Sequence, residues 1–488
     1  MTQDRSKQAG MLTSVEFIRF GCKALVGVIL ARILLPAELG SYRQLFLIYT
    51  TFSTLMLLGI PQSVLYFLPK FRHSETKAEF ITRTVNLVSW LAFLFAAGIF
   101  LLRGLIARVF HNPELDTLLV IYAIYPLFMF ITQIYSSVTL GLQQPVKTAT
   151  FTLFTVATDL LFILGAALLT KDLSRIVLGV MISAFMQWAF AQWQLSRYRI
   201  KASFDPNYYR DVFNYSLPLG LSSIIGMLSI QLDKLVVSGF FTPAQYAVFS
   251  IGAMELPFIS ILNNSVNAIL LPHISGDTAQ MEQIYRAAVR KNALIIFPFS
   301  MLAFIFAKPL ITLLYTNTYA ASVPYFQVYL LVLPLKVATY GIIFMAMQKT
   351  RYIMVNSLLT LGLNLVLNLI LVKAIGMMGA ALATVIVTWL SVAIYMFWIK
   401  NHLKLRLNDL FPWKAIMRTA LATVVAGALS MAVFFAFGQD WIWQFAALAV
   451  FAAAFILVGR GLNAILPYDV AYVKTLFRQA RTRLGKAS

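Results

Sequence analysis

The sequence contains few of the residues that a soluble catalytic protein carries on its surface. Only 12% of its 488 residues are charged, and just 18 of them are acidic. The single cysteine, Cys22, excludes an internal disulfide. The four histidines lie near segment ends at unrelated spacings, so we expect no metal site. A composition this poor in charge excludes an ordinary soluble domain.

Apolar residues take the place of the missing charge. They make up 60% of the chain, and the mean hydropathy is +0.80. Such a chain is typical of an all-α polytopic membrane protein, because a helix of about 20 apolar residues crosses a bilayer. The first run is too long and too charged for a cleavable signal peptide. About fourteen transmembrane helices are predicted, at residues 11–34, 43–67, 84–102, 117–141, 148–170, 174–196, 212–239, 244–271, 292–315, 323–347, 352–373, 377–399, 414–437 and 441–465.

The net charge of +21 would suggest nucleic acid as the partner of a soluble protein. In a membrane protein, the positions of Lys and Arg instead indicate which loops lie in the cytoplasm. With a cytoplasmic N-terminus, most Lys and Arg fall in cytoplasmic loops and in the basic, amphipathic tail at 467–488. Both termini are therefore predicted to be cytoplasmic and nucleic acid is not an expected partner. The loops are too short for a catalytic domain, which predicts that the protein is not an enzyme. Only seven basic residues fall on the other side, namely Arg43, Arg103, Arg108, Lys171, Arg175, Lys308 and Lys373.

An internal repeat at an offset of about 205 residues organises the chain. The stretch Pro36–Tyr42 returns as Pro243–Phe249, and Asn112 returns as Asn317. Each repeat holds six predicted helices, an even number, so two parallel lobes are expected with the substrate site between them. The predicted domains are an N-lobe at 1–197, a C-lobe at 198–402, two further helices at 403–466 as a candidate lipid-tail groove, and a cytoplasmic tail at 467–488.

The first helix carries unusual charge for a spanning segment. Glu16, Arg19 and Lys23 share one narrow stripe, and Arg32 points to the opposite side. Each charge at bilayer depth costs roughly 2.5–3.5 kcal/mol, so such residues usually face an internal path. The simpler alternative is a local Glu16–Arg19 pair with a snorkelling Arg32. The sharper hypothesis is a cationic stripe that lines a cavity, in which Arg19 and Lys23 bind substrate and Glu16 is a candidate for ion coupling.

A polar stripe in the fifth predicted helix contains a carboxylate near mid-bilayer. Thr148, Thr152, Thr155 and Asp159 stack on one face. The eleventh helix repeats the arrangement without an acid, with Ser357, Thr360, Asn364 and Asn368. The hydroxyls could simply bond their own helix carbonyls and mediate packing. A mid-membrane Asp159 is harder to explain in that way, and we interpret it as a proton or cation site.

Three further charged residues fall in helices of the second repeat or at its start. Lys234, in the seventh helix, points in the same relative direction within the second repeat as the Arg19–Lys23 stripe does within the first. It is therefore a further candidate substrate ligand. Its neighbour Asp233 is a candidate for ion coupling, or it simply neutralises a neighbouring cation. Glu255, with mostly apolar neighbours on its face, is a weaker coupling or structural candidate.

Lys336 lies near the middle of the tenth predicted helix, between Tyr329 and Tyr340 on one face. No acidic residue lies within one turn of it, so it cannot form an ion pair within its own helix. A central lysine of this kind needs a partner across the bundle or an anionic ligand. Lys336 and the two tyrosines are therefore candidate substrate-binding residues.

The segments LARILLPAELGSYRQ and LLGIPQSVLYFLPKF together resemble the polysaccharide-transporter, Wzx-type oligosaccharide flippase family. That family belongs to the multidrug/oligosaccharidyl-lipid/polysaccharide exporter superfamily. The resembling elements are Leu30 to Arg32, Pro36 to Tyr42, and Gly59 to Pro61 leading to Pro69. The repeat architecture extends the likeness over roughly residues 10–400.

The resemblance implies a flippase in the bacterial cytoplasmic (inner) membrane. Its substrate would be an undecaprenyl-pyrophosphate-linked repeat unit for O-antigen, lipopolysaccharide, capsule or exopolysaccharide, moved to the periplasmic leaflet by ion-coupled alternating access. Membrane lipids, a polysaccharide polymerase and a chain-length regulator are the implied partners. No cofactor is expected beyond a coupling Na⁺ or H⁺. The alternatives are a lipid II-type precursor flippase and a multidrug or cation antiporter of the same superfamily.

Overall fold

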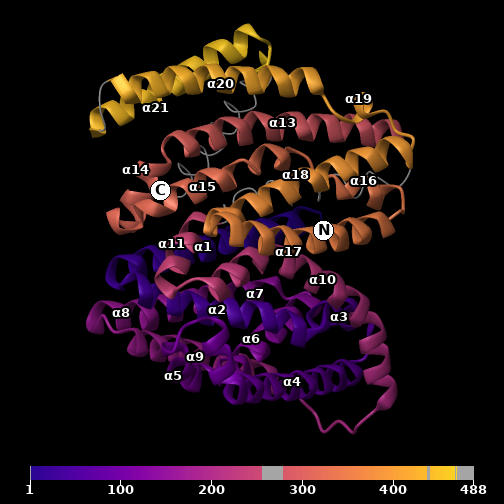
Figure 1. Cartoon of the computed structure of the whole chain (residues 1–488). Helices are drawn as coiled ribbons and strands as arrows, with labels where there is room; N and C mark the ends of the chain where they lie inside the picture. Colours follow the sequence, from indigo (N-terminus) through magenta and orange to yellow (C-terminus); the bar gives the residue numbers. More distant parts are fainter. Residues whose placement is uncertain (1, 255–277, 437–439, 468, 470–488) are drawn as a thin grey trace, which may run out of the picture. The chain divides into compact units, whose positions relative to one another are not determined.

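The protein is built from helices (Figure 1). The computed structural model describes residues 2–254, 278–436, 440–467 and 469, and this part of the chain contains no strand. The first half holds the elements α1 (Thr2–Ile33), α2 (Pro36–Leu57), α3 (Ile60–Phe67), η1 (Leu68–Lys70), α4 (Ser74–Val109), α5 (Glu114–Tyr122), α6 (Tyr125–Gly141), α7 (Pro145–Thr158), η2 (Asp159–Leu164), α8 (Gly165–Thr170), α9 (Leu173–Ser196), α10 (Pro206–Phe240) and α11 (Pro243–Gly252).

The second half continues the helical pattern after residue 278. Its elements are α13 (Thr278–Ile305), α14 (Ala307–Tyr315), η3 (Asn317–Ser322), α15 (Val323–Leu330), η4 (Leu333–Val337), α16 (Gly341–Ala346), α17 (Arg351–Ile375), α18 (Met377–Asn401), α19 (Leu407–Leu410), α20 (Trp413–Ala436) and α21 (Trp441–Gly461). The all-helical fold class predicted from the sequence is confirmed.

Twelve of the fourteen predicted spans correspond to helices that are long and apolar enough to cross a membrane. Within the described residues nine are single helices, and three more are pairs bent by 45° to 49° at a short break. The first predicted span is helical, as part of α1, but it does not belong to this set because of the charged residues that it carries, among them Glu16, Arg19 and Lys23. The eighth predicted span, 244–271, lies mostly outside the described residues.

The bend between α2 and α3 follows from the local sequence. Leu58 ends α2 in the left-handed region with φ of 43°, and Gly59 follows with φ of 76°. Glycine adopts this conformation without a steric penalty, and Pro61 then starts a new helix in a new direction. The two halves of this span are therefore bent by 48°.

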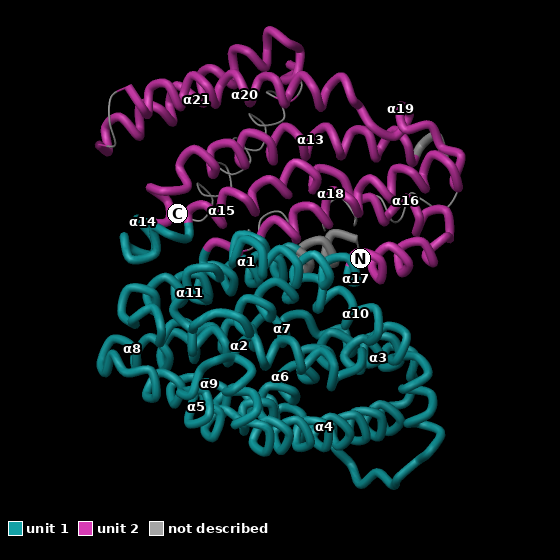
Figure 2. Tube along the Cα trace, in the orientation of Figure 1, with its two compact units in different colours: residues 1–251, 312–322, 361–380 teal, residues 252–311, 323–360, 381–488 magenta. Residues whose placement is uncertain are grey.

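Two compact units make up the chain (Figure 2). Unit 1 consists of residues 1–251, 312–322 and 361–380, and unit 2 of residues 252–311, 323–360 and 381–488. In unit 2, α20 and α21 pack against each other and against α13. Ile305, Ala426, Phe451 and Ala454 form the buried core where these three helices meet. The division into lobes at 197 and 402, and the tail-groove role of 403–466, stay predictions.

Candidate functional site

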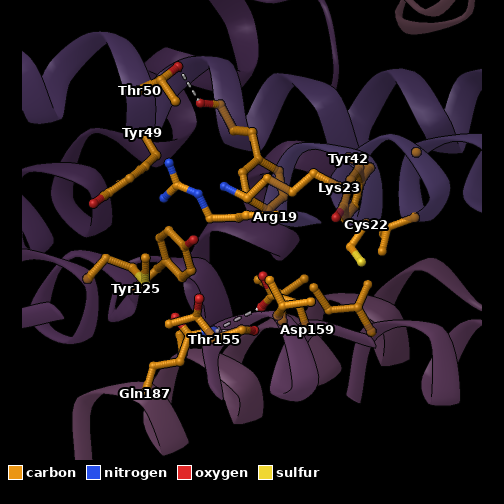
Figure 3. Close-up of a pocket in the computed structure, with 18 of the residues that line it drawn as sticks. Arg19, Cys22, Lys23, Tyr42, Tyr49, Thr50, Tyr125, Thr155, Asp159 and Gln187 are labelled. Atoms are coloured by element: carbon orange, nitrogen blue, oxygen red, sulfur yellow. Dashed lines mark hydrogen bonds between the residues drawn. The ribbon is translucent and has the colours of Figure 1, made fainter. Parts of the chain in front are cut away.

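A cavity of about 630 Å³ lies within unit 1 (Figure 3). Side chains from α1, α2, α6, α7, η2, α9, α10 and α11 line it. Cavities of roughly 300–1,000 Å³ hold ligands of the size of a drug molecule. The cavity is therefore large enough for a polar ligand of that size.

Four cationic side chains line the cavity. Arg19 and Lys23 come from α1, Arg43 from α2 and Lys234 from α10. The structure thus brings together the candidate ligands Arg19 and Lys23 of the first helix and Lys234 of the seventh, as the sequence predicted them on two different helices. It adds Arg43, which the sequence assigned to an outer loop. Among the described lining residues, Asp159 is the one carboxylate, so the cavity has an excess of positive charge.

The cations differ in how they are compensated. Arg19 pairs with Glu16 at 2.5 Å, which is the local ion pair given as the simpler alternative in the sequence analysis. Arg43 Nη1 donates to Ser250 Oγ at 2.8 Å. The ammonium groups of Lys23 and Lys234 make no hydrogen bond or ion pair with any described residue. Two ammonium groups that face one cavity without a hydrogen-bonded or ion-paired partner make it suited to an anionic ligand.

Asp159 begins a π-helical stretch, η2, at the end of α7. Its Oδ1 accepts hydrogen bonds from Ser183 Oγ at 2.7 Å and from Gln187 Nε2 at 2.9 Å, both on α9. Insertions of this kind in an α-helix occur frequently at functional sites. The arrangement leaves Oδ2 of Asp159 without a hydrogen bond to a described residue.

The close approach of η2 to α9 depends on Gly179. A side-chain Cβ at this position would lie 2.5 Å from the carbonyl oxygen of Phe162 and 3.0 Å from Ala166. Glycine therefore lets η2 pack directly on α9, one turn from Ser183. Ser183 and Gln187 were missed by sequence reasoning, since their hydrogen bonds to Asp159 join two different helices.

The threonines that precede Asp159 have the local bonding that the alternative interpretation describes. Thr152 donates to the carbonyl of Thr148 at 2.9 Å, and Thr155 to that of Thr152 at 2.8 Å. Both still line the cavity. On α17, Asn368 Nδ2 donates to Asn364 Oδ1 at 2.7 Å. Neither asparagine is among the cavity residues.

The remaining cations and acids from the sequence lie elsewhere. Arg32 Nε donates to the carbonyl of Leu314 at 3.0 Å, near the end of α14. Asp233 is buried, and its Oδ1 accepts from the backbone N–H of Lys234 at 2.7 Å. Glu255 lies outside the described residues. These three residues do not belong to the described lining of the cavity.

Lys336 and its two tyrosines are not among the residues that line this cavity either. Lys336 lies in η4, a short 3₁₀ turn between α15 and α16, and it is exposed. Tyr340 stacks against Phe411, with ring centroids 5.9 Å apart, and Tyr329 lies on α15. The helical face on which the sequence aligned them is interrupted, because this span is bent by 45°. Their role in binding stays a prediction.

The fold is that of membrane flippases and transporters. The structure of the lipid II flippase MurJ in an inward closed conformation matches with a TM-score of 0.75 and 16% identity, covering 92% of this chain and 97% of that one. A multidrug resistance MATE family transporter of the MOP superfamily, in an inward-facing conformation, matches with a TM-score of 0.63 and 12% identity, covering 81% of this chain and 98% of the other.

The sequence itself shows the family. The profile of the family described as "Polysaccharide biosynthesis protein" matches residues 29–324, and the chain belongs to this family. The capsular polysaccharide biosynthesis protein CapF of Staphylococcus aureus is 22% identical, over 78% of this chain and 95% of the relative. The sequence matches therefore confirm a polysaccharide biosynthesis family, and the solved structures share the fold of this chain.

Proposed function

We propose that this protein flips lipid-linked oligosaccharides, in which pyrophosphate joins a sugar repeat unit to undecaprenol, from the cytoplasmic to the periplasmic leaflet of the inner membrane. The observation that carries the proposal is the presence of two ammonium groups, Lys23 and Lys234, without partners in one cavity. A pyrophosphate that leaves water loses its hydration, and charge-assisted hydrogen bonds from these cations compensate for that loss.

The family supports the choice of cargo. The chain belongs to a family of polysaccharide biosynthesis, and a sugar unit joined to its lipid by pyrophosphate is a polysaccharide precursor whose charge a cationic cavity would bind. The cavity volume of about 630 Å³ suits a polar head and not the polyprenyl chain. The tail would then remain in the surrounding lipid while the head crosses.

The proposed mechanism is alternating access, with the two predicted six-helix lobes rocking about the cavity. Both termini would lie in the cytoplasm, as the distribution of Lys and Arg indicates. Asp159, held through Oδ1 by Ser183 and Gln187, would bind the coupling H⁺ or Na⁺ through its other oxygen. It faces the same cavity as Lys23, which gives the ion and the substrate a direct electrostatic connection.

Two alternative cargoes are distinguished by charge and family. A lipid II-type precursor carries the same pyrophosphate, but the family match favours a unit of a surface polysaccharide. A cationic drug needs acidic groups in the binding site. The described lining residues hold four cations and one carboxylate, which opposes that cargo.

The test is deletion of the gene in its host followed by complementation. We expect surface polysaccharide to disappear and lipid-linked repeat units to accumulate on the cytoplasmic face. The wild-type gene should restore export, Lys23→Ala should not, and the control Lys373→Ala should, because Lys373 is exposed at the end of α17 and does not line the cavity. Normal surface glycan together with new drug sensitivity in the deletion strain would refute the proposal.

A further inference from the structure

The cavity has two chemically different sides. The cations come from α1, α2 and α10, whereas α6, α7 and α9 contribute mostly neutral polar groups such as Gln133, Thr155 and Gln187. Figure 3 shows Arg19 and Lys23 extending from one side, with Thr155 and Gln187 on the other. A pyrophosphate would occupy only the cationic side, so the neutral side needs a different explanation.

The hydrogen bonds of the neutral side separate structural groups from free ones. The hydroxyls of Thr152 and Thr155 are used by their own helix. The amide of Gln187 bonds Thr158 Oγ1 at 3.0 Å as well as Asp159. In contrast, the side-chain amide of Gln133 makes no hydrogen bond with a described residue. The same holds for Gln231, which lies on α10 beside the cations.

These two glutamines are well placed for a ligand. Gln133 lies on α6, lines the cavity and is exposed there. Gln231 lies on α10, one turn before Lys234, and its Oε1 is buried without a partner. A buried polar atom left without a hydrogen bond costs free energy, so an unpartnered amide in a cavity is suited to a ligand that bonds it.

We infer that Gln133 and Gln231 bind the hydroxyl or acetamido groups of the sugar part of the cargo, and that they determine which glycan is accepted. This inference rests on the proposed function. A primary amide offers both a donor and an acceptor, which matches the paired hydroxyls of a sugar ring. A site built to hydrogen-bond such groups discriminates strongly against a ligand that lacks them, because its own polar atoms are then left unpaired.

The experiment compares two probes with purified protein in nanodiscs. One is undecaprenyl pyrophosphate without sugar, and the other is the lipid-linked repeat unit extracted from the host. Gln133→Leu keeps the size of the side chain and removes the amide. Thr152→Val is the matched control, since Thr152 lines the same cavity but its hydroxyl is already bonded within α7.

We expect Gln133→Leu to weaken the binding of the sugar-bearing probe about tenfold and to leave the affinity for the sugar-free probe unchanged. Thr152→Val should change neither affinity. Equal weakening of both probes, or of neither, would overturn the inference while leaving the proposed function intact. Absence of binding of both probes to the wild type would instead refute the proposed function, and the inference with it.

A second observation independently carries another proposal. Five residues form a polar cluster beside the cavity, which Arg43 and Ser250 also line. We call this cluster the axial clasp: Arg43, Gln44, Asn112, Ser238 and Ser250. Asn112 Nδ2 donates to Gln44 Oε1 at 2.7 Å, Gln44 Nε2 donates to Ser238 Oγ at 2.8 Å, and Arg43 donates to Ser250. Gln44, Asn112 and Ser238 are all at most 3% exposed.

The internal repeat shows that the axial clasp joins equivalent positions of the two repeats. Pro36–Tyr42 aligns with Pro243–Phe249, so the next residue of each segment, Arg43 and Ser250, occupies the same position in the two repeats. These equivalent residues are in direct contact at 2.8 Å. Equivalent positions of two repeats meet only near the axis that relates them. The contact therefore lies where the two repeats must separate if the cavity opens between them.

We propose that the axial clasp holds the cavity closed between the two repeats, and that substrate is released there only after the hydrogen bonds of the clasp break. The clasp is connected to the binding site through the chain. Arg43 lines the cavity next to Gln44, and Lys234 lines it one turn before Ser238. An anion held by Arg43 and Lys234 would therefore act directly on the helices that carry the clasp.

The single cysteine provides the reporter for the test, because Cys22 lines the cavity. A membrane-impermeant maleimide is added to right-side-out and to inverted vesicles, and the rate of Cys22 labelling is measured. Ser238→Ala removes the acceptor of Gln44 without adding bulk. Ser63→Ala is the matched control, as Ser63 is equally buried but bonds only the carbonyl of Ile60 in its own helix.

From the side closed by the clasp, we expect Ser238→Ala to raise the labelling rate at least about fivefold, with Ser63→Ala at the wild-type rate. Asn112→Ser should act in the same direction, which guards against misfolding of a single variant. Wild-type labelling rates in both variants, at normal expression, would overturn the proposal. Rapid labelling of the wild type from both sides would overturn it as well.

Discussion

Replacing Lys23 by alanine should remove substrate affinity without destabilising the protein. Lys23 is one of the two cavity cations without a partner among the described residues. A hydrogen bond to a charged group contributes about 1.5–3 kcal/mol, so the affinity for a pyrophosphate ligand should fall roughly 10- to 150-fold. Lys23 lies beside Arg19 (Figure 3). Losing it relieves like-charge repulsion, and the thermal stability should not fall.

The assay measures binding of radiolabelled undecaprenyl pyrophosphate to purified protein in nanodiscs, with the thermal midpoint recorded for each variant. Lys23→Arg keeps the charge and should lose much less affinity. Lys373→Ala removes a lysine outside the cavity and should bind like the wild type. The reasoning is refuted if Lys23→Ala binds as tightly as the wild type, or if Lys373→Ala loses as much affinity.

Three further predictions concern the surroundings of the site. Asp159→Asn should make transport independent of an imposed Na⁺ or H⁺ gradient, and a gradient dependence equal to the wild type would contradict the coupling role. Gly179→Ala should lower stability by about 1–3 kcal/mol in a thermal assay, whereas Gly165→Ala, with nothing within 4 Å of its Cβ, should not destabilise. Arg290→Ala should lower the free energy of unfolding by about 3 kcal/mol, because it leaves the carboxylate of Asp469 without its ion-pair partner. The two side chains are only 11% and 17% exposed. A shift of the thermal midpoint below the assay error would refute this prediction.

The sequence predicted the spanning helices well because their signal is local. Apolar runs of sufficient length correspond to twelve spans of the described structure, including the bent pair that contains Gly59. The stripe on α1 was also readable, since Arg19 and Lys23 lie one turn apart on one helix. Their common cavity with Lys234 followed from the internal repeat.

The parts that sequence reasoning missed depend on contacts between helices or on breaks within them. Ser183 and Gln187 meet Asp159 only because α9 packs on η2. Arg43 was counted as a loop residue, although it already lies within α2. Lys336 was placed by a regular helical period, and η4 interrupts that period at Pro334.

The central claim is that the cationic cavity carries a lipid-linked sugar across the membrane, and the most direct measurement is flipping in proteoliposomes. Purified protein is reconstituted with a fluorescent lipid-linked repeat unit, and the fraction reaching the opposite leaflet is followed with an impermeant quencher. We predict rapid flipping by the wild type and by Lys373→Ala, and a rate near that of protein-free vesicles for the double variant Lys23→Ala/Lys234→Ala. Flipping by the double variant at the wild-type rate would contradict the account.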